Sequence, residues 1–255
     1  MRKIADIYEY LCNLAPLELQ MSFDNSGFQI GRMDKEINKV LLALDVTDAV
    51  ADEAVELGAG LIISHHPLLF SAVKSIDGSD PAGERLLRLI ENGIAVISMH
   101  TNLDIAEGGV NDVLIRLLGA EPDSALDSEG CGRIGEYKQP FELSDFIKLC
   151  QDKLKVNGIR FYDAGEKVCK LAVMGGAGGD CLEDAYNKGC DTYLTADIKY
   201  HQFLRAQELG INLIDADHFC TENPVIPALR EKLTEQFKDI EFIVSSKHKA
   251  IISFA

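Results

Sequence analysis

The sequence predicts an α/β protein built from two similar βαβ-type lobes with largely parallel sheets. Three observations lead to this prediction. Short apolar runs alternate with amphipathic helical segments, the alternation occurs twice along the chain, and polar residues follow the apolar runs at corresponding places. Strands that alternate with helices are typical of βαβ units. The chain has 255 residues, of which 47% are hydrophobic, so two modest lobes can each bury a core.

The first half begins with an amphipathic helix and continues as strand, helix and strand. The helix is expected at 2–14 and ends near Pro16. A polar turn follows, and then come a strand at 39–45, a helix at 47–58 capped by Thr47 and ended by Gly58, a strand at 60–64, a helix at 81–93 and a strand at 94–99.

The second half repeats this order. Residues 169–203 match the strand, helix and strand that start at residue 39, and residues 203–219 match 86–104, with Gly210 at the place of Gly93. Two explanations stay open at this stage: an internal duplication, or the helix, glycine and strand that any two βα units share.

The remaining segments connect the halves or end the chain. Residues 119–137 are polar and glycine-rich and are expected to cross between the halves; the other expected elements are a helix at 141–154, a strand at 158–163, a helix at 226–239 and a strand at 240–246. We therefore expect an N-terminal lobe at 1–125 and a C-terminal lobe at 126–255.

Composition restricts the classes of partner and the compartment. There are 41 acidic and 25 basic residues, a formal charge of −16, which disfavours binding of nucleic acid and of anionic membranes. The seven cysteines form no CxxC pair, and their odd number indicates a reducing compartment. The N-terminus has acidic residues where a signal peptide needs an apolar core, and no run is long enough to span a membrane. The expected location is cytoplasmic.

Four of the expected strands are followed by polar clusters. In parallel α/β folds ligands bind at the carboxyl ends of the strands, so these clusters are expected at that edge. Five of the six histidines lie in or just beyond them, and imidazole with carboxylate suits zinc, iron, manganese, cobalt or nickel. The clusters are Ser64-His65-His66, His100 to Asp104, Thr195 to Asp197, and Asp215 to Glu222.

The pair His65 and His66 favours a dinuclear site. Adjacent side chains of a continuing strand point to opposite faces, but a strand that ends before Pro67 lets both rings reach two ions or two sides of one ion. A polar strand end is the simpler alternative for this pair taken alone.

Two further pairs have a spacing of four residues. His100 and Asp104 form one pair, and His218 and Glu222 form the other. Residues four apart lie on one face of a helical turn and can bind one centre. Each pair alone is compatible with a helix cap or a surface pair. The three groups at equivalent strand ends together predict metal ligands, with Asp104 and Glu222 as bridging or terminal carboxylates.

Five motifs in this order make the chain resemble the Nif-three-like family, whose members are often named GTP cyclohydrolase type-two homologues. The motifs are "DNSGFQIG", "SHHP" with a following phenylalanine, "SMHTNLD", "GGAGG" and "DADHFCTE". The resemblance covers nearly the whole chain. It implies two similar lobes with a dinuclear metal site in the cleft between them, a ring-shaped homohexamer, and two divalent ions per chain held by His65, His66, Asp104, His218 and Glu222, with His100 nearby in the pocket.

The chain departs from the family pattern in two respects. The tryptophan that usually precedes "DN" is Phe23 here, and the chain has no tryptophan at all, which alters packing beside the site. The stretch 126–168 leaves no room for the middle domain that longer members carry.

Several other residues are secondary candidates. Asp24, Asn25, Asp197 and His201 are expected to bond the ligand histidines or to contact substrate, although caps and turns are the alternative. In the turn 174–180 the GxGxxG register fails at Cys181, which leaves a phosphate-binding turn or a tight turn beside the pocket. Cys220 is either a soft ligand or a small buried residue, and the sixth histidine, His248, is expected at the surface.

The expected function is metal-dependent hydrolysis of a small molecule. Two ions generate hydroxide near neutral pH, and His100 is the candidate for proton transfer. The resemblance implies hydrolytic ring opening of GTP or action on another nucleotide. The ligand types do not choose among zinc, iron, manganese and nickel. The alternative is a non-enzymatic protein that stores, delivers or senses metal as a ring-shaped oligomer.

Overall fold

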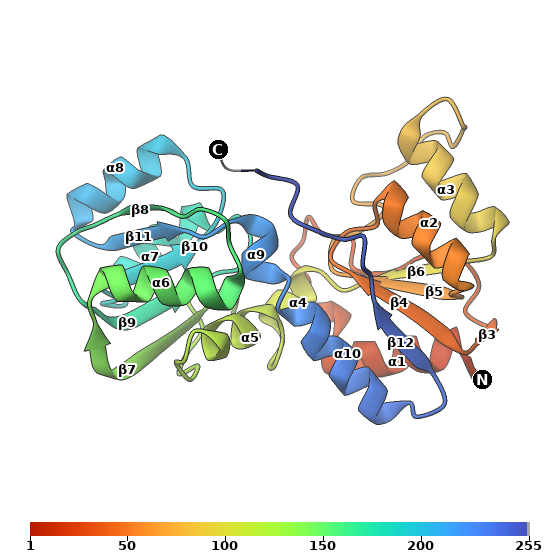
Figure 1. Cartoon of the computed structure of the whole chain (residues 1–255), viewed down its shortest axis with the longest axis horizontal. Helices are drawn as coiled ribbons and strands as arrows, with labels where there is room; N and C mark the ends of the chain where they lie inside the picture. Colours follow the sequence, from red (N-terminus) through yellow and green to blue (C-terminus); the bar gives the residue numbers. More distant parts are fainter. Residues whose placement is uncertain (254–255) are drawn as a thin grey trace. The chain divides into compact units, whose positions relative to one another are not determined.

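The computed structural model describes residues 1–253, which fold into two compact units. Unit 1 comprises residues 1–106 and 226–249, and unit 2 comprises residues 107–225 with the described residues from 250 on. Each unit is built on one five-stranded sheet covered by helices (Figure 1). The prediction of an α/β protein with mostly parallel sheets is confirmed.

The sheet of unit 1 has the strand order β12-β4-β5-β6-β2. All neighbouring strands are parallel except β2, which runs antiparallel to β6. The strands are β2 (Gly27–Ile30), β4 (Lys39–Ala43), β5 (Leu61–Ser64), β6 (Ala95–Ser98) and β12 (Glu241–Val244), and a separate antiparallel pair joins β1 (Arg2–Lys3) to β3 (Glu36–Ile37).

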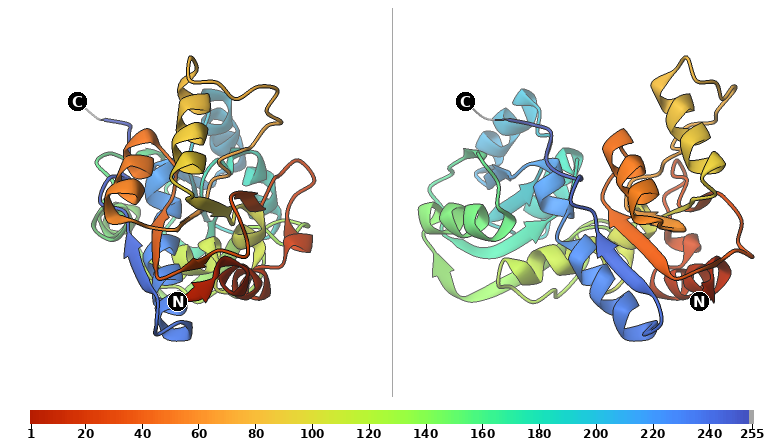
Figure 2. Two further views of the ribbon diagram at one scale, coloured as in Figure 1. Left: turned by 90° about the vertical axis from the view of Figure 1, so that its right-hand side faces the viewer. Right: turned by 45° about the vertical axis from the view of Figure 1, so that its right-hand side comes forward.

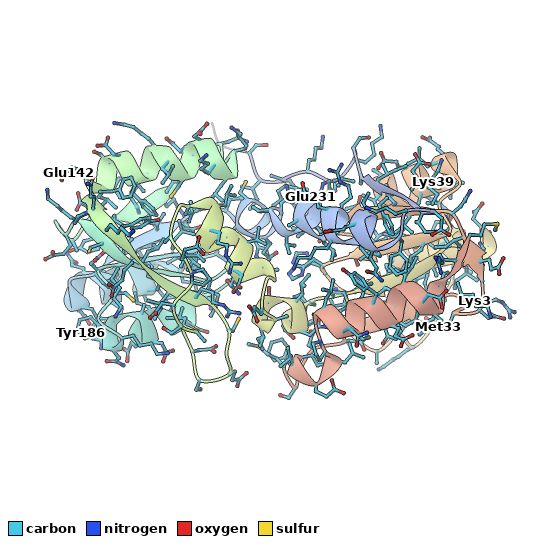
Figure 3. The ribbon with its side chains drawn as sticks, turned by 90° about the horizontal axis from the view of Figure 1, so that it is seen from below. Lys3, Met33, Lys39, Glu142, Tyr186 and Glu231 are labelled. Carbon is cyan, nitrogen blue, oxygen red and sulfur yellow. The ribbon has the colours of Figure 1, made fainter. Side chains whose placement is uncertain are left out.

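Helices cover both faces of this sheet. One face packs on α2 (Asp48–Leu57) and α3 (Pro81–Glu91), with Leu41, Ile62 and Val96 in the shared core. On the other side α1 (Ile4–Leu14) and α10 (Val225–Gln236) lie next to each other, and the Tyr10 and Phe237 rings are in edge contact. Figure 3 shows this side, with Lys3 labelled just before α1 and Glu231 on α10. The central strands are therefore buried on both faces, which explains their unbroken apolar runs.

The start and end of α2 agree with the prediction from sequence. The Thr47 side chain accepts a hydrogen bond from the Val50 amide, and Gly58 ends the helix with φ of 64°. A residue with a positive φ closes a helix most easily when it is glycine. This closure turns the chain directly into β5, the strand that leads to the two adjacent histidines.

The sheet of unit 2 has the strand order β7-β9-β10-β11-β8. The three central strands are parallel, while β7 and β8 are antiparallel edges. Leu171, Leu194 and Ile214 share a core with α5 and α6 on one face. The elements are α5 (Val110–Leu117), β7 (Arg133–Phe141), α6 (Leu143–Leu154), β8 (Arg160–Tyr162), β9 (Val168–Val173), η2 (Gly179–Cys181), α7 (Leu182–Asn187), β10 (Thr192–Thr195), α8 (Tyr200–Leu209) and β11 (Asn212–Asp215).

The two sheets share the order of four strands. In unit 1, β4, β5 and β6 are parallel and β2 is antiparallel beside β6; in unit 2, β9, β10 and β11 are parallel and β8 is antiparallel beside β11. A five-residue helix follows the third parallel strand in each unit, α4 (Thr101–Ile105) and α9 (His218–Glu222). The fifth strands differ, since β12 is parallel to β4 and β7 is antiparallel to β9.

Three sequence expectations differ from this fold. Residues 133–137, expected in a crossing segment, begin β7, because they pair with β9 as an edge strand. The segment before β4 contains β2, a strand that the sequence does not predict. The expected lobe boundary at residue 125 also differs from the observed units. Residues 226–249 belong to unit 1, because β12 pairs with β4. Such pairings between distant segments leave no local signal in the sequence.

Within residues 1–253, no helix combines the length and the apolar character that crossing a membrane requires. The remaining short helix is η1 (Leu17–Leu19).

Candidate functional site

Three histidines of unit 1 come together at the carboxyl ends of β5 and β6. We call His65, His66 and His100 the histidine cluster. Each offers a ring nitrogen, and these three atoms lie within 4.8 Å of one another. Because β5 ends at Ser64, the His65 and His66 rings are not forced to opposite faces, and their centroids are 5.0 Å apart. This spacing would let His65 and His66 bind an ion with His100 beside it.

The Nδ1 atom of each of these histidines is bonded to an oxygen. His65 Nδ1 donates to the Met99 carbonyl at 2.8 Å, His66 Nδ1 to Asp45 at 2.7 Å, and His100 Nδ1 to Asp24 at 2.8 Å. These acceptors place the imidazole proton on Nδ1 and leave the lone pair on Nε2. Metal-binding histidines are held in this way in proteins, by a carbonyl or a carboxylate on the other nitrogen.

Asp24 is the acceptor with the most hydrogen bonds in this arrangement. Its side chain is fully buried and accepts from His100 Nδ1, the Asn25 amide, the Ser26 hydroxyl, and the amide and hydroxyl of Thr101. Burial alone would raise the pKa of Asp24, but the hydrogen bonds from His100, Thr101 and Ser26 hold it well below its usual range. Asp24 is thus a buried anion that fixes the position of His100.

Asp104 lies on α4, close to the histidine cluster. Its Oδ1 is 3.6 Å from His65 Nε2, and its side chain is 13% exposed. Asp104, four residues after His100, therefore places its carboxylate beside His65 Nε2, the ring nitrogen that points away from the Met99 carbonyl. This geometry fits a carboxylate ligand beside the imidazoles.

Unit 2 contains a second group of histidine and carboxylates. His218 and Glu222 are the first and last residues of α9, and His218 Nε2 lies 3.1 Å from Glu222 Oε2. His218 Nδ1 donates to Asp197 at 2.7 Å, so this ring is held in the same way as those of unit 1. Burial would lower the pKa of His218, but the hydrogen bond and charge of Glu222, and then those of Asp197, raise it to about 9.

The glycine-rich turn lies against this second group. A Cβ on Gly176 would approach Glu222 Oε1 to 2.2 Å and His218 Nε2 to 3.2 Å, and Gly176 has φ of 67°. The Gly176 amide donates to Thr221, and the Gly178 amide donates to Thr195. These amides are already bonded within the protein, so the geometry favours the tight turn over a phosphate-binding turn.

The other predicted residues have different surroundings. His201 is exposed on the first turn of α8, and Asn25 donates to the Leu69 carbonyl at 2.5 Å. Cys220 is buried in the core of unit 2, where burial, followed by Asp217, raises its pKa to about 12. His248 was expected at the surface but is half-buried, because its Nδ1 accepts a hydrogen bond from the Leu44 amide.

Two residues of the site were not predicted from sequence, Asp45 and Met99, whose carboxylate and carbonyl orient His66 and His65. Gly176, in the turn expected beside the pocket, provides the space that Glu222 occupies. Asp45 ends the apolar run "KVLLALD", so the rule that strand ends carry functional residues could have identified it. A backbone carbonyl has no residue-type signal.

The donor set fits a divalent transition metal. Neutral imidazole nitrogens whose other nitrogen is bonded to oxygen, next to carboxylates, are ligands that zinc, iron, manganese and nickel accept. The His65–His66–His100 group within one unit satisfies this test by its own distances.

The fold and these residues define a class: a protein with two α/β units, each with histidine and carboxylate groups after its parallel strands. The chain belongs to the Duf34/NIF3 (NGG1p interacting factor 3) family, whose model matches residues 2–250.

Relatives and solved structures agree with this assignment. A protein of Clostridium perfringens (strain 13 / Type A), described as "GTP cyclohydrolase 1 type 2 homolog", is 38% identical and the match covers 99% of each chain. A Methanocaldococcus jannaschii protein of the same description is 34% identical over 94% of this chain and 98% of its own. The crystal structure of a Bacillus cereus protein related to NIF3 has a TM-score of 0.94 at 26% identity and covers 100% of this chain and 99% of its own.

Proposed function

We propose that the protein is a metal-dependent hydrolase that holds two divalent ions with His65, His66, Asp104, His218 and Glu222. One observation carries the proposal: the Nδ1 atoms of His65, His66 and His218 are each bonded to an oxygen acceptor, as those of metal-binding histidines are, which directs Nε2 of each ring away from that acceptor. A polar strand end with no ligand would not require this arrangement at each ring. The identity of the ions is left open, because the ligand types suit zinc, iron, manganese and nickel.

Bound divalent ions would supply a nucleophilic hydroxide near neutral pH and polarise the group under attack. His100 is proposed to transfer the proton. Its Nε2 has the lone pair, and the buried Asp24 carboxylate bonded to Nδ1 would stabilise the ring once it is protonated. Asp24 thereby orients His100 and balances its charge.

The proposed substrate class is a nucleotide such as GTP. The support is that the relatives are described as "GTP cyclohydrolase 1 type 2 homolog". The reaction would be hydrolytic opening of the guanine ring. An acidic chain of formal charge −16 disfavours an anionic substrate, so bound cations would have to balance part of its charge. A ring-shaped homohexamer, as the family resemblance implies, is part of the same proposal.

The test uses the full chain loaded separately with zinc, iron, manganese and nickel. Each form is assayed for turnover of GTP and of a simple phosphoester, and His66→Ala and Asp104→Ala serve as controls. The proposal expects at least one loaded form to turn over a substrate well above both controls. If none exceeds them while the wild type retains metal, the protein is a metal-binding protein without hydrolase activity, which is the competing function.

A further inference from the structure

An exposed aromatic ring lies next to the histidine cluster. Phe70 is 52% exposed, and its ring centroid is 6.1 Å from that of His100 with the ring planes at 85°. This separation lies within the range of about 4.5–7 Å for interacting rings. Phe70 therefore contacts the cluster while much of its surface stays open to a ligand.

Side chains of the segment 24–29 hold the residue before Phe70 in place. The Leu69 amide donates to Gln29 Oε1 at 3.1 Å, and the Leu69 carbonyl accepts from Asn25 Nδ2 at 2.5 Å. Gln29 Nε2 in turn donates to the Asn25 carbonyl at 2.8 Å. Both polar groups of the Leu69 backbone are therefore bonded to side chains, which restricts the position of the next residue, Phe70.

The same segment also fixes His100. Asp24 accepts from His100 Nδ1, and the next residue, Asn25, donates to Leu69. The separation between Phe70 and His100 is thus set by two adjacent residues. Sites that must hold a ligand in one geometry are supported in this way, by side chains that restrict the groups in contact with it.

A recess borders Phe70 at the loop that leads into α3. Its volume is about 270 Å³, and it is lined by apolar side chains including Leu68, Phe70, Val73 and Leu86, with Ser71 and Arg85 among its polar residues. This volume is close to the lower end of the roughly 300–1,000 Å³ of small-molecule sites. The loop extends from the carboxyl end of β5 to the start of α3 (Figure 2).

We propose that Phe70 is the stacking surface for a planar heteroaromatic ring of the ligand, and that Asn25 and Gln29 are the residues that position it. The inference rests on the proposed metal site, because the histidine cluster is what brings the ligand to Phe70. It adds a specificity: a flat ring is bound better than a ligand of equal charge that has none. Stacking suits this role because every heteroaromatic base has a π face.

The test compares ring-containing and ring-free probes on zinc-loaded protein by calorimetry. The ring probes are GTP, flavin mononucleotide and pterin, and the ring-free probe is inorganic tripolyphosphate. Phe70→Ala is expected to weaken binding of the ring probes by about 5- to 150-fold, the range of base–aromatic stacking, and to leave tripolyphosphate binding unchanged. Phe70→Tyr, which keeps the ring, is expected to bind like the wild type.

Three results would overturn the proposal: equal binding of ring probes by wild type and Phe70→Ala, an equal loss for tripolyphosphate, or no binding of any ring probe by wild type. Its failure is distinguishable from failure of the hydrolase proposal. GTP turnover that is indifferent to Phe70→Ala leaves the hydrolase standing without the stacking surface. Ring binding that depends on Phe70 without any turnover leaves the stacking surface without the hydrolase.

The absence of tryptophan offers a second readout. Phe70→Trp introduces a single tryptophan beside the histidine cluster, and Phe161→Trp introduces one at an exposed position, 48% accessible, on β8 of unit 2. The ring probes are expected to quench the emission of Phe70→Trp and not that of Phe161→Trp. Adding Asn25→Ala to Phe70→Trp should reduce that quenching while zinc content stays the same. Equal quenching of both single-tryptophan proteins would contradict the assignment.

Discussion

Replacing Asp24 by asparagine tests the buried carboxylate that holds His100. Asp24 Oδ1 accepts from His100 Nδ1 and the Asn25 amide, and Oδ2 accepts from Ser26 and from two groups of Thr101. In Asp24→Asn one oxygen becomes an NH2 group. The position with fewer donors is Oδ1, so the NH2 group is expected to face His100. His100 then accepts at Nδ1, and its proton moves to Nε2.

The expected loss follows from the hydrogen bonds. Bonds to a charged group contribute about 1.5–3 kcal/mol each and bonds to a neutral group about 1 kcal/mol. Three bonds on the Oδ2 side would become neutral, and the Asn25 amide would turn to water. We expect the free energy of unfolding of the metal-free protein to fall by about 2–4 kcal/mol at pH 7.

Urea denaturation with a chelator present measures the free energy of unfolding of the metal-free protein. Asp34→Asn, at an exposed position, is the matched control and should stay within about 0.5 kcal/mol of wild type. Nitrogen-15 NMR of the imidazoles should show His100 protonated at Nδ1 in the wild type and at Nε2 in Asp24→Asn. A loss below 1 kcal/mol with an unchanged tautomer would refute this reasoning.

The pH dependence of Asp24 has a definite sign. Its folded-state pKa is lowered, so its contribution to stability is present above the unfolded value of about 3.9 and is lost as the pH falls towards the folded value. The Asp24→Asn protein should therefore lack this acid-induced loss of stability.

Three further predictions concern other parts of the chain. The pKa of His218 is raised to about 9, so its stabilising contribution is fully present below about pH 6.5 and is lost as the pH rises through 9. The free energy of unfolding of the metal-free protein should fall by about 1–2 kcal/mol over this range, a figure reduced for partial exposure. Urea titrations should show this loss in wild type and not in Glu222→Gln. Gly176→Ala should lower the free energy of unfolding by about 1–3 kcal/mol because of backbone strain, and should also lower the metal content. Gly189→Ala is the control: Gly189 has φ of 72° and a Cβ there would meet no atom within 4 Å, so this variant should show the strain alone. Glu53→Gln should lower the free energy of unfolding by about 1–3 kcal/mol and speed hydrogen exchange after β12, because Glu53 accepts three hydrogen bonds from the two serines there; unchanged exchange would contradict this role.

The regular elements near the site could be predicted because their signals are local. The apolar run at 60–64 predicts a strand, and Thr47 and Gly58 predict the start and end of the helix before it, as the structure shows. The placement of histidines after strands followed from the topology of parallel sheets. In the structure, one ring nitrogen of each of His65, His66 and His100 lies within 4.8 Å of the other two.

Other features depend on contacts between distant segments. The pairing of β12 with β4 joins residues about two hundred positions apart in the chain, and edge strand β7 has exposed positions that resemble a loop in sequence. The bond from His248 to the Leu44 amide has the same origin, since a histidine in a charged tail gives no sign of its partner. Such pairings are set by tertiary packing, which single-sequence patterns do not contain.

The central claim, that this chain binds two divalent ions through its histidines and carboxylates, is tested most directly by elemental analysis of protein purified without chelators. The account predicts about two divalent ions per chain in the wild type and a substantial loss in His65→Ala and in His218→Ala, with folding of both variants checked by circular dichroism. Well under one ion per chain in every wild-type preparation, including protein incubated with zinc, iron, manganese and nickel, would contradict it.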